Sequence, residues 1–244
     1  LHAVGGFEAL TVLKTVLTAT VMLTFALSLR RQAPSAWIIL CGLAMLWVMV
    51  GRVRVRPEIF TLAFIMLTIA LVESVRRGAP ARRLWWMVPV MLTWANMHGL
   101  YMLGVGLMWA AVLGAFVDRR LPGSRTTGEL TTRGALVPVV AATVACLVTP
   151  WPVEAALHPI LLFERISGES DYYTYGVSEL QRTWNVLWAY KWAMLLMAAC
   201  VCVMIVNYRR LPVAHVLWFA AFVVIAMMAV RNVGLTAPVC GYIL

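Results

Sequence analysis

Residues 84–117 read LWWMVPVMLTWANMHGLYMLGVGLMWAAVLGAFV, 34 residues without one Asp, Glu, Lys or Arg. As a single α-helix this stretch would extend about 51 Å at 1.5 Å per residue. The hydrocarbon core of a bilayer is only about 30 Å thick, so one span would be too long. The polar segment Asn96-Met97-His98-Gly99 lies near the middle, and we expect a tight helical hairpin that turns there. The alternative is one long helix kinked at Pro89.

The composition also indicates a membrane protein. Hydrophobic residues make up 63% of the chain and charged residues 12%, against roughly 25% charged residues in globular domains. The net charge of +10 comes from short basic clusters between apolar runs, which argues for loops at a membrane surface rather than for nucleic-acid binding. The five cysteines lie within apolar runs and form no metal-ligand pattern. Because the chain begins with Leu1 and stops in an apolar run, we expect it to be an internal piece of a longer protein.

The apolar runs predict an all-α, polytopic transmembrane bundle of about nine spans. The expected spans cover approximately residues 8–29, 36–51, 58–75, 84–97, 99–117, 134–150, 187–206, 213–230 and one that begins near 233. In this division 1–150 and 191–244 hold transmembrane helices. Between them, 151–190 forms an extracytoplasmic loop, in which Val153–Ile166 is expected to be a surface-lying amphipathic helix.

The arginine distribution supports the hairpin independently. With a turn at Asn96–Gly99, alternate loops place twelve basic residues on one face of the membrane and seven on the other. The positive-inside rule makes the richer face cytoplasmic. If 84–117 were one span, the later basic loops would change sides and this bias would largely vanish. The polar features at 52–58, 96–99 and 151–190 then lie on the outer face.

The loop Arg52-Val53-Arg54-Val55-Arg56-Pro57-Glu58 is a candidate site for a lipid phosphate. In an extended segment, alternation places all three guanidiniums on one side, and arginine offers bidentate donors to phosphate oxygens. Arg231 is a further candidate, either for the same phosphate or as part of a helix stop. Glu58 could orient an arginine, bind a metal or act in catalysis. Anchoring on lipid headgroups is the alternative for the arginines.

A candidate substrate pocket combines Asn96 and His98 with the aromatic loop residues Tyr172 and Tyr173. Histidine and asparagine are costly at membrane depth unless they have partners, so they are functional suspects. His98 could act as an acid or base, or bind phosphate when protonated; a turn with a backbone-bonded histidine is the structural alternative. The tyrosines could stack on sugar rings, although aromatic belts occur at any membrane interface.

Several motifs, in order, resemble a group of bacterial multi-pass proteins related to the GT-C glycosyltransferases. They are Arg56-Pro57-Glu58-Ile59-Phe60, Leu84-Trp85-Trp86, Trp94-Ala95-Asn96-Met97-His98-Gly99 and Arg231-Asn232-Val233. The group includes dolichyl-phosphate-mannose protein mannosyltransferase-like and lipopolysaccharide-sugar transferase-like families. The chain departs from the pattern at Leu100, where a second glycine is common, and at Thr149-Pro150-Trp151-Pro152, which replaces a more usual Asn-Pro-Tyr-Gly.

The resemblance implies an inverting transfer of a sugar from a polyprenyl-phosphate-linked donor to an acceptor hydroxyl outside an inner (plasma) membrane. It also implies that the catalytic Asp lies upstream of Leu1, after one preceding span, and that basic residues stabilise the departing lipid phosphate. Some relatives bind a divalent metal and others do not. Two alternatives stay open. A transporter or flippase for a lipid-linked or anionic substrate would favour charges near mid-bilayer, and a non-catalytic membrane protein would not need the outer arginines.

Overall fold

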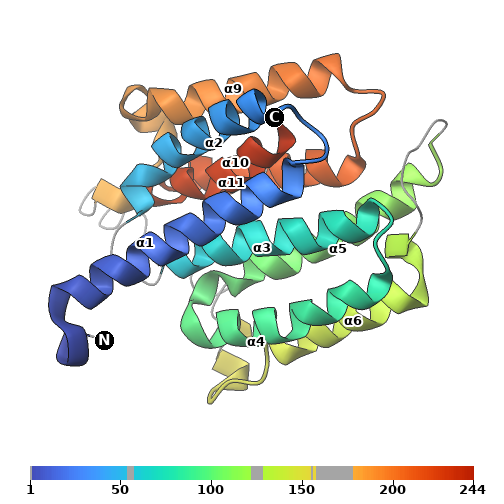
Figure 1. Ribbon diagram of the computed structural model, residues 1–244, viewed down its shortest axis with the longest axis horizontal. Helices are drawn as coiled ribbons and strands as arrows, with labels where there is room; N and C mark the ends of the chain where they lie inside the picture. The colour runs from blue at the N-terminus through green and yellow to red at the C-terminus, as the bar shows by residue number, and fades with distance from the viewer. Residues whose placement is uncertain (1, 54–57, 122–128, 155, 158–177) are drawn as a thin grey trace.

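The computed structural model is a bundle of helices that run roughly along one axis (Figure 1). It describes residues 2–53, 58–121, 129–154, 156–157 and 178–244. The residues in these ranges that have regular secondary structure are helical, and none is in a strand. The prediction of an all-α protein is therefore confirmed. The arginine loop residues 54–57, most of the expected amphipathic helix, Tyr172 and Tyr173 lie outside the described part of the chain.

Within the described residues, four helical segments are long and apolar enough to cross a membrane, and they indicate a membrane protein. These segments are Gly6–Leu29, Glu58–Arg76, Gly99–Asp118 and Leu187–Val206. Three shorter apolar helices, Ser35–Met49, Arg133–Ala145 and Val213–Met228, accompany them. The outer surface of the bundle carries many large apolar side chains, for example Leu43 and Leu113, each more than half exposed. An apolar exterior of this extent fits lipid better than water.

The first three α-helices follow the expected runs. Helix α1 spans His2–Leu29 and is kinked at Gly6, whose φ of +58° favours glycine. Helix α2 spans Ser35–Met49, and Pro34 precedes its first residue. After the short 3₁₀ helix η1 (Val50–Arg52), α3 spans Glu58–Arg76.

The uncharged stretch 84–117 is divided into two helices at the polar segment Asn96–Gly99, where a turn was predicted. Helix α4 ends at Met97, His98 is extended (φ −157°, ψ 136°), and α5 begins at Met102 after the 3₁₀ turn η3. The hairpin is therefore confirmed and the single kinked helix is excluded. The beginning of the expected 84–97 span differs, because Ala81–Trp86 forms a 3₁₀ helix, η2, and only Met87–Met97 is α-helical.

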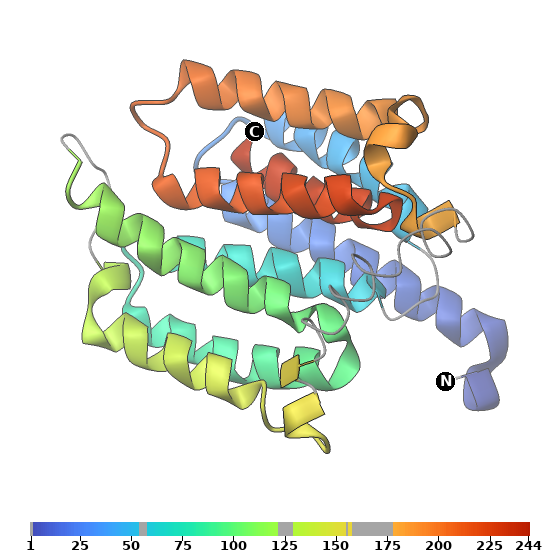
Figure 2. The same ribbon diagram turned by 180° about the vertical axis from the view of Figure 1, so that it is seen from behind.

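The remaining elements complete the bundle around α3. They are η4 (Glu129–Thr131), α6 (Arg133–Ala145), η5 (Ser178–Leu180), η6 (Thr183–Asn185), η7 (Leu187–Tyr190), α9 (Lys191–Val206), α10 (Val213–Met228), η8 (Val230–Leu235) and α11 (Thr236–Ile243). Helices α4 and α6 pack together on one side of α3 and α5, whereas α2, α9 and α11 gather on the other (Figures 1 and 2). The helices of 191–244 thus belong to the same bundle as those of 1–150.

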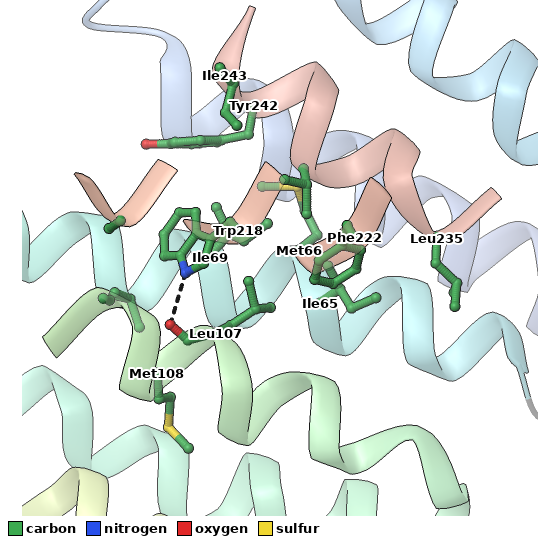
Figure 3. Packing of buried hydrophobic residues seen from close by; sticks show 14 of the residues in the cluster. Ile65, Met66, Ile69, Leu107, Met108, Trp218, Phe222, Leu235, Tyr242 and Ile243 are labelled. Carbon is green, nitrogen blue, oxygen red and sulfur yellow. Dashed lines mark hydrogen bonds between the residues drawn. The ribbon is translucent and has the colours of Figure 1, made fainter. Parts of the chain in front are cut away.

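The core is built where α10 and α11 meet α3 and α5. Trp218 and Phe222 of α10 are buried beside Ile65 and Ile69 of α3 (Figure 3). The Trp218 indole donates a hydrogen bond to the Leu107 carbonyl of α5 at 2.9 Å, which satisfies its only polar group. Every residue of α11 is buried, so this short helix is surrounded by protein.

The bundle has two ends of different character. At one end, which we call the arginine-rich end, lie the turns that follow α1, α3, α5 and α9 (Figure 1). Their described arginines are Arg30, Arg31, Arg77, Arg119, Arg120, Arg209 and Arg210. At the other end lie η1, the 98–101 turn, 178–190 and η8, and we call this the cavity end (Figure 1). The described basic turns thus lie together at one end of the bundle, as they must if they share one face of a membrane.

Candidate functional site at the cavity end

A cavity of about 270 Å³ opens where α2 ends, α3 begins and η8 follows α10. Its charged lining consists of Glu58, Glu179 and Arg231, all of them half-buried. One guanidinium and two carboxylates in one hollow can hold a phosphate on one side and hydroxyl groups on the other. No other residue of the cavity wall within the described part of the chain carries a formal charge.

Arg231 reaches the cavity because α10 stops abruptly. The helix ends at Met228, and Ala229 is extended (φ −154°, ψ 136°) before η8 begins. Asn232 holds this turn, since its side-chain amide donates to the Ile225 carbonyl at 3.1 Å and its backbone N–H donates to the Ala229 carbonyl at 2.8 Å. The two roles considered for Arg231 and Asn232 are therefore divided: Asn232 stops the helix and Arg231 lines the cavity.

Glu179 is brought to Arg231 by the packing of a distant segment. Val230 donates its backbone N–H to the Gln181 carbonyl at 2.9 Å. Thr183, which is fully buried, donates its hydroxyl to the Ala226 carbonyl near the end of α10. These two bonds join 178–185 to the turn that carries Arg231. Glu179 lies in the expected outer loop 151–190 and was not among the candidate site residues.

Glu58 is the first residue of α3, where a carboxylate is favoured by the helix dipole. It faces the cavity together with Gly51 of η1. The structure therefore brings two of the predicted site residues, Glu58 and Arg231, to one place. The side chains of Arg52, Arg54 and Arg56 lie outside the described part of the chain, as do Tyr172 and Tyr173.

Aromatic side chains surround the mouth of the cavity. Trp47, Tyr190 and Trp192 contribute to its wall, and Trp47 and Trp192 are more than half exposed. The Lys191 ammonium lies 5.6 Å from the centre of the Trp192 ring and 5.4 Å from that of Trp188, close enough for cation–π attraction. Rings of this kind can pack on a sugar or rest at a membrane interface.

His98, a candidate for the substrate pocket, does not line the cavity that contains Arg231. The Thr61 hydroxyl of α3 accepts a hydrogen bond from the Trp94 indole at 3.3 Å and lies 3.0 Å from His98 Nδ1. The backbone N–H of Leu100 also donates to His98 Nδ1, at 3.4 Å. An Nδ1 that accepts must be unprotonated, so Thr61 donates to it. His98 thus caps the η3 turn, which is the structural alternative considered for it.

Asn96 likewise has a structural part in the turn. Its side-chain amide donates to the Leu92 carbonyl within α4 at 2.8 Å and to the Val148 carbonyl after α6 at 2.9 Å. Asn96 therefore ties the end of α4 to the segment that follows α6. Neither hydrogen bond directs Asn96 toward the cavity of Arg231, and Asn96 is not among its lining residues.

A second polar cluster lies near the arginine-rich end, and the sequence analysis missed it. Glu73 of α3 is fully buried and accepts hydrogen bonds from Arg76 at 2.6 and 2.7 Å. His215 of α10 lies 3.0 Å from its Oε1, and the Tyr242 hydroxyl of α11 donates to its Oε2 at 3.2 Å. The available signal was an ionisable residue inside an apolar run, which is a functional suspect by default.

The described residues contain no group of three or more His, Cys, Asp or Glu side chains placed to hold a metal ion. Glu58 and Glu179 are the acids of the cavity.

The chain matches no protein-family model, no curated protein and no solved structure. The resemblance to GT-C glycosyltransferases therefore rests on the motifs in the sequence.

Proposed function

We propose that this chain is the membrane core of a glycosyltransferase that uses a polyprenyl-phosphate-linked sugar at the extracytoplasmic face. The observation that carries the proposal is the cavity that combines Arg231 with Glu58 and Glu179. A lipid-linked sugar donor presents a phosphate next to a polyhydroxylated ring. A guanidinium binds the phosphate bidentately, and carboxylates accept hydrogen bonds from the hydroxyl groups of the sugar.

In the proposed reaction an acceptor hydroxyl attacks the anomeric carbon, and the bond from that carbon to the lipid phosphate oxygen breaks with inversion. The proton of the hydroxyl passes to an acidic residue, which the family resemblance puts upstream of Leu1. Arg231 stabilises the negative charge that develops on the departing phosphate. Glu58 and Glu179 orient the sugar through its hydroxyls, and Tyr190 and Trp192 pack against the ring.

The proposal includes the placement of the chain in the membrane. All of the expected spans contain a helix within the described residues, and in a GT-C-like arrangement about nine of them cross an inner (plasma) membrane. The cavity end is then extracytoplasmic, which agrees with the gathering of arginine turns at the opposite end. A donor whose lipid tail lies in the bilayer would approach the cavity past the exposed Trp47 and Trp192.

The test is the affinity of the purified protein, with its full natural chain, for a polyprenyl phosphate in detergent. We expect Arg231→Ala to weaken binding by at least tenfold. Arg231→Lys should also weaken it, because lysine keeps the charge but not the bidentate geometry. The matched control is Arg182→Lys, since Arg182 belongs to the same end but stacks on Trp184, with its guanidinium carbon 5.1 Å from the ring centre. Equal affinity of the wild type and both Arg231 variants would refute the proposed role of Arg231.

The buried Glu73 cluster favours transport as the second candidate function, because intramembrane ionisable groups often mark substrate or proton pathways. Glu73 lies near the end of α3, about one turn from Arg76, rather than at mid-span. Reconstitution into proteoliposomes separates the two functions. A transporter would move a lipid-linked or anionic substrate and lose that activity in Glu73→Gln, whereas the glycosyltransferase would keep its polyprenyl phosphate affinity in that variant.

A further inference from the structure

A second cavity, of about 710 Å³, lies at the arginine-rich end between the last turns of α1 and α3. Four arginines line it. Arg30 and Arg31 follow α1, Arg77 follows α3, and Arg83 belongs to η2. The described lining includes no Asp or Glu. The ends of α1 and α3 that line it lie at the opposite end of the bundle from η1 and η8, which line the proposed transferase site (Figure 1), and that function makes no use of it.

The positive charge of the cavity is not balanced from within the described residues. Arg77 donates to two backbone carbonyls, those of Ser28 at 3.0 Å and Glu73 at 3.1 Å. The Glu73 carboxylate, one turn away, is already engaged by Arg76 and His215. Arg30, Arg31 and Arg83 form no ion pair with any described residue. Arginines gathered without acids between membrane helices attract anionic headgroups.

The residues that line the cavity beside the arginines favour a lipid over a free anion. Ser28, Gln32 and Ser74 lie among the arginines and offer further hydrogen-bonding groups. Thr24 and Leu27 line the part along α1, and Thr24 precedes Arg30 by six residues, which is about 9 Å along a helix. Leu27 is half exposed on the surface of the bundle. The basic rim of the cavity therefore adjoins an exposed apolar side chain, Leu27, on the surface of α1.

We propose that this cavity binds an anionic glycerophospholipid of the leaflet at the arginine-rich end. Arg30, Arg31 and Arg83 surround the phosphate, and Arg77 is held in place by its bonds to Ser28 and Glu73. One acyl chain lies against Leu27 along α1. The bound lipid joins α1 to the η2 segment. It would therefore stabilise the folded protein in a membrane that contains acidic lipids.

The experiment measures binding of dioctanoyl phosphatidylglycerol to the full natural chain in neutral detergent. Dioctanoyl phosphatidylcholine, with the same chains but no net charge, and inorganic phosphate are the comparison ligands. The test variant is Arg30→Gln, Arg31→Gln and Arg83→Gln together, which leaves the structural bonds of Arg77 intact. The matched control combines Arg120→Gln, Arg133→Gln and Arg210→Gln, three exposed arginines of the same end that do not line the cavity.

We expect the cavity variant to lose about a hundredfold in phosphatidylglycerol affinity, because each basic residue near an acidic headgroup contributes roughly a factor of five. The control variant should stay within about threefold of the wild type, and phosphatidylcholine should bind weakly to all three proteins. Equal losses in the two variants, or no loss in either, would overturn the site. Inorganic phosphate that binds as tightly as phosphatidylglycerol would overturn the assignment to a lipid. An unchanged elution profile and helix content of the cavity variant exclude misfolding as the cause.

Discussion

Glu73 Oε1 lies 3.0 Å from His215 Nε2, and this contact joins the last turn of α3 to the first turn of α10 in the buried interior. The same carboxylate receives Arg76 from its own helix and Tyr242 from α11. One acidic side chain thus connects three helices near the arginine-rich end. Its removal would take away the carboxylate to which the Arg76 guanidinium, only 14% exposed, donates two hydrogen bonds.

We therefore expect Glu73→Ala to destabilise the protein by about 3–5 kcal/mol, the usual cost of breaking a buried ion pair. Glu73→Gln should cost less, since the amide oxygen still accepts one hydrogen bond from Arg76. Thermal unfolding in detergent is the measurement, and Glu8→Ala is the control because Glu8 is exposed. A Glu73→Ala variant as stable as Glu8→Ala would show that the cluster does not hold the helices together.

Gly114 marks the closest approach of two helices. A Cβ added there would lie 2.5 Å from the backbone nitrogen of Ala214 and 2.8 Å from its Cα, so α5 and α10 would have to separate. Gly114→Ala should destabilise the bundle by at least about 1–3 kcal/mol, as overpacking does. Gly106→Ala in the same helix is the control, since a Cβ there meets nothing within 4 Å. It should be neutral or slightly stabilising because alanine favours helix. Equal unfolding midpoints for the two variants would contradict the tight contact.

Thr61 and Thr68 of α3 permit a second matched comparison. Both are fully buried, but Thr61 accepts from Trp94 and contacts His98. The Thr68 hydroxyl has no hydrogen-bond partner among the described residues. Thr61→Val leaves the buried Trp94 N–H unsatisfied, at a cost of about 1–3 kcal/mol. Thr68→Val should be neutral or stabilising, because it removes an unpaired polar group. Chemical denaturation in mixed micelles distinguishes the two, and a reversed order would refute this assignment of the hydrogen bonds.

The turn after α4 predicts the accessibility of Met97, whose side chain is 39% exposed. In a variant without Cys202, the exposed native cysteine, Met97→Cys should react with a membrane-impermeant thiol reagent from the extracytoplasmic side. Arg120→Cys, at the arginine-rich end, should react from the opposite side only. Labelling of both from one side would disprove the proposed orientation and with it the extracytoplasmic position of the cavity.

The sequence by itself determined the helical class and the places where helices end. Apolar runs long enough to span a membrane predicted where the helices lie along the chain. Asn96–Gly99 set the hairpin turn because 34 uncharged residues are too many for one crossing. The arginine pattern placed the basic loops together, because successive spans run in opposite directions and alternate loops therefore lie on the same side. Arg231 was selected because arginine offers bidentate donors to a phosphate, and Glu58 because its carboxylate could orient an arginine.

The tertiary structure decided which of the polar residues meet. Glu179 reaches Arg231 through the hydrogen bonds of Gln181 and Thr183 to the end of α10, and those depend on packing between segments far apart in the chain. His98 caps the turn beside Thr61 and Asn96 ties it to Val148, and neither lines the cavity. A helical period tells which face of one helix is polar, but not which neighbour that face meets. The partners of Glu73 and the basic cavity between α1 and α3 could therefore come only from the packed bundle.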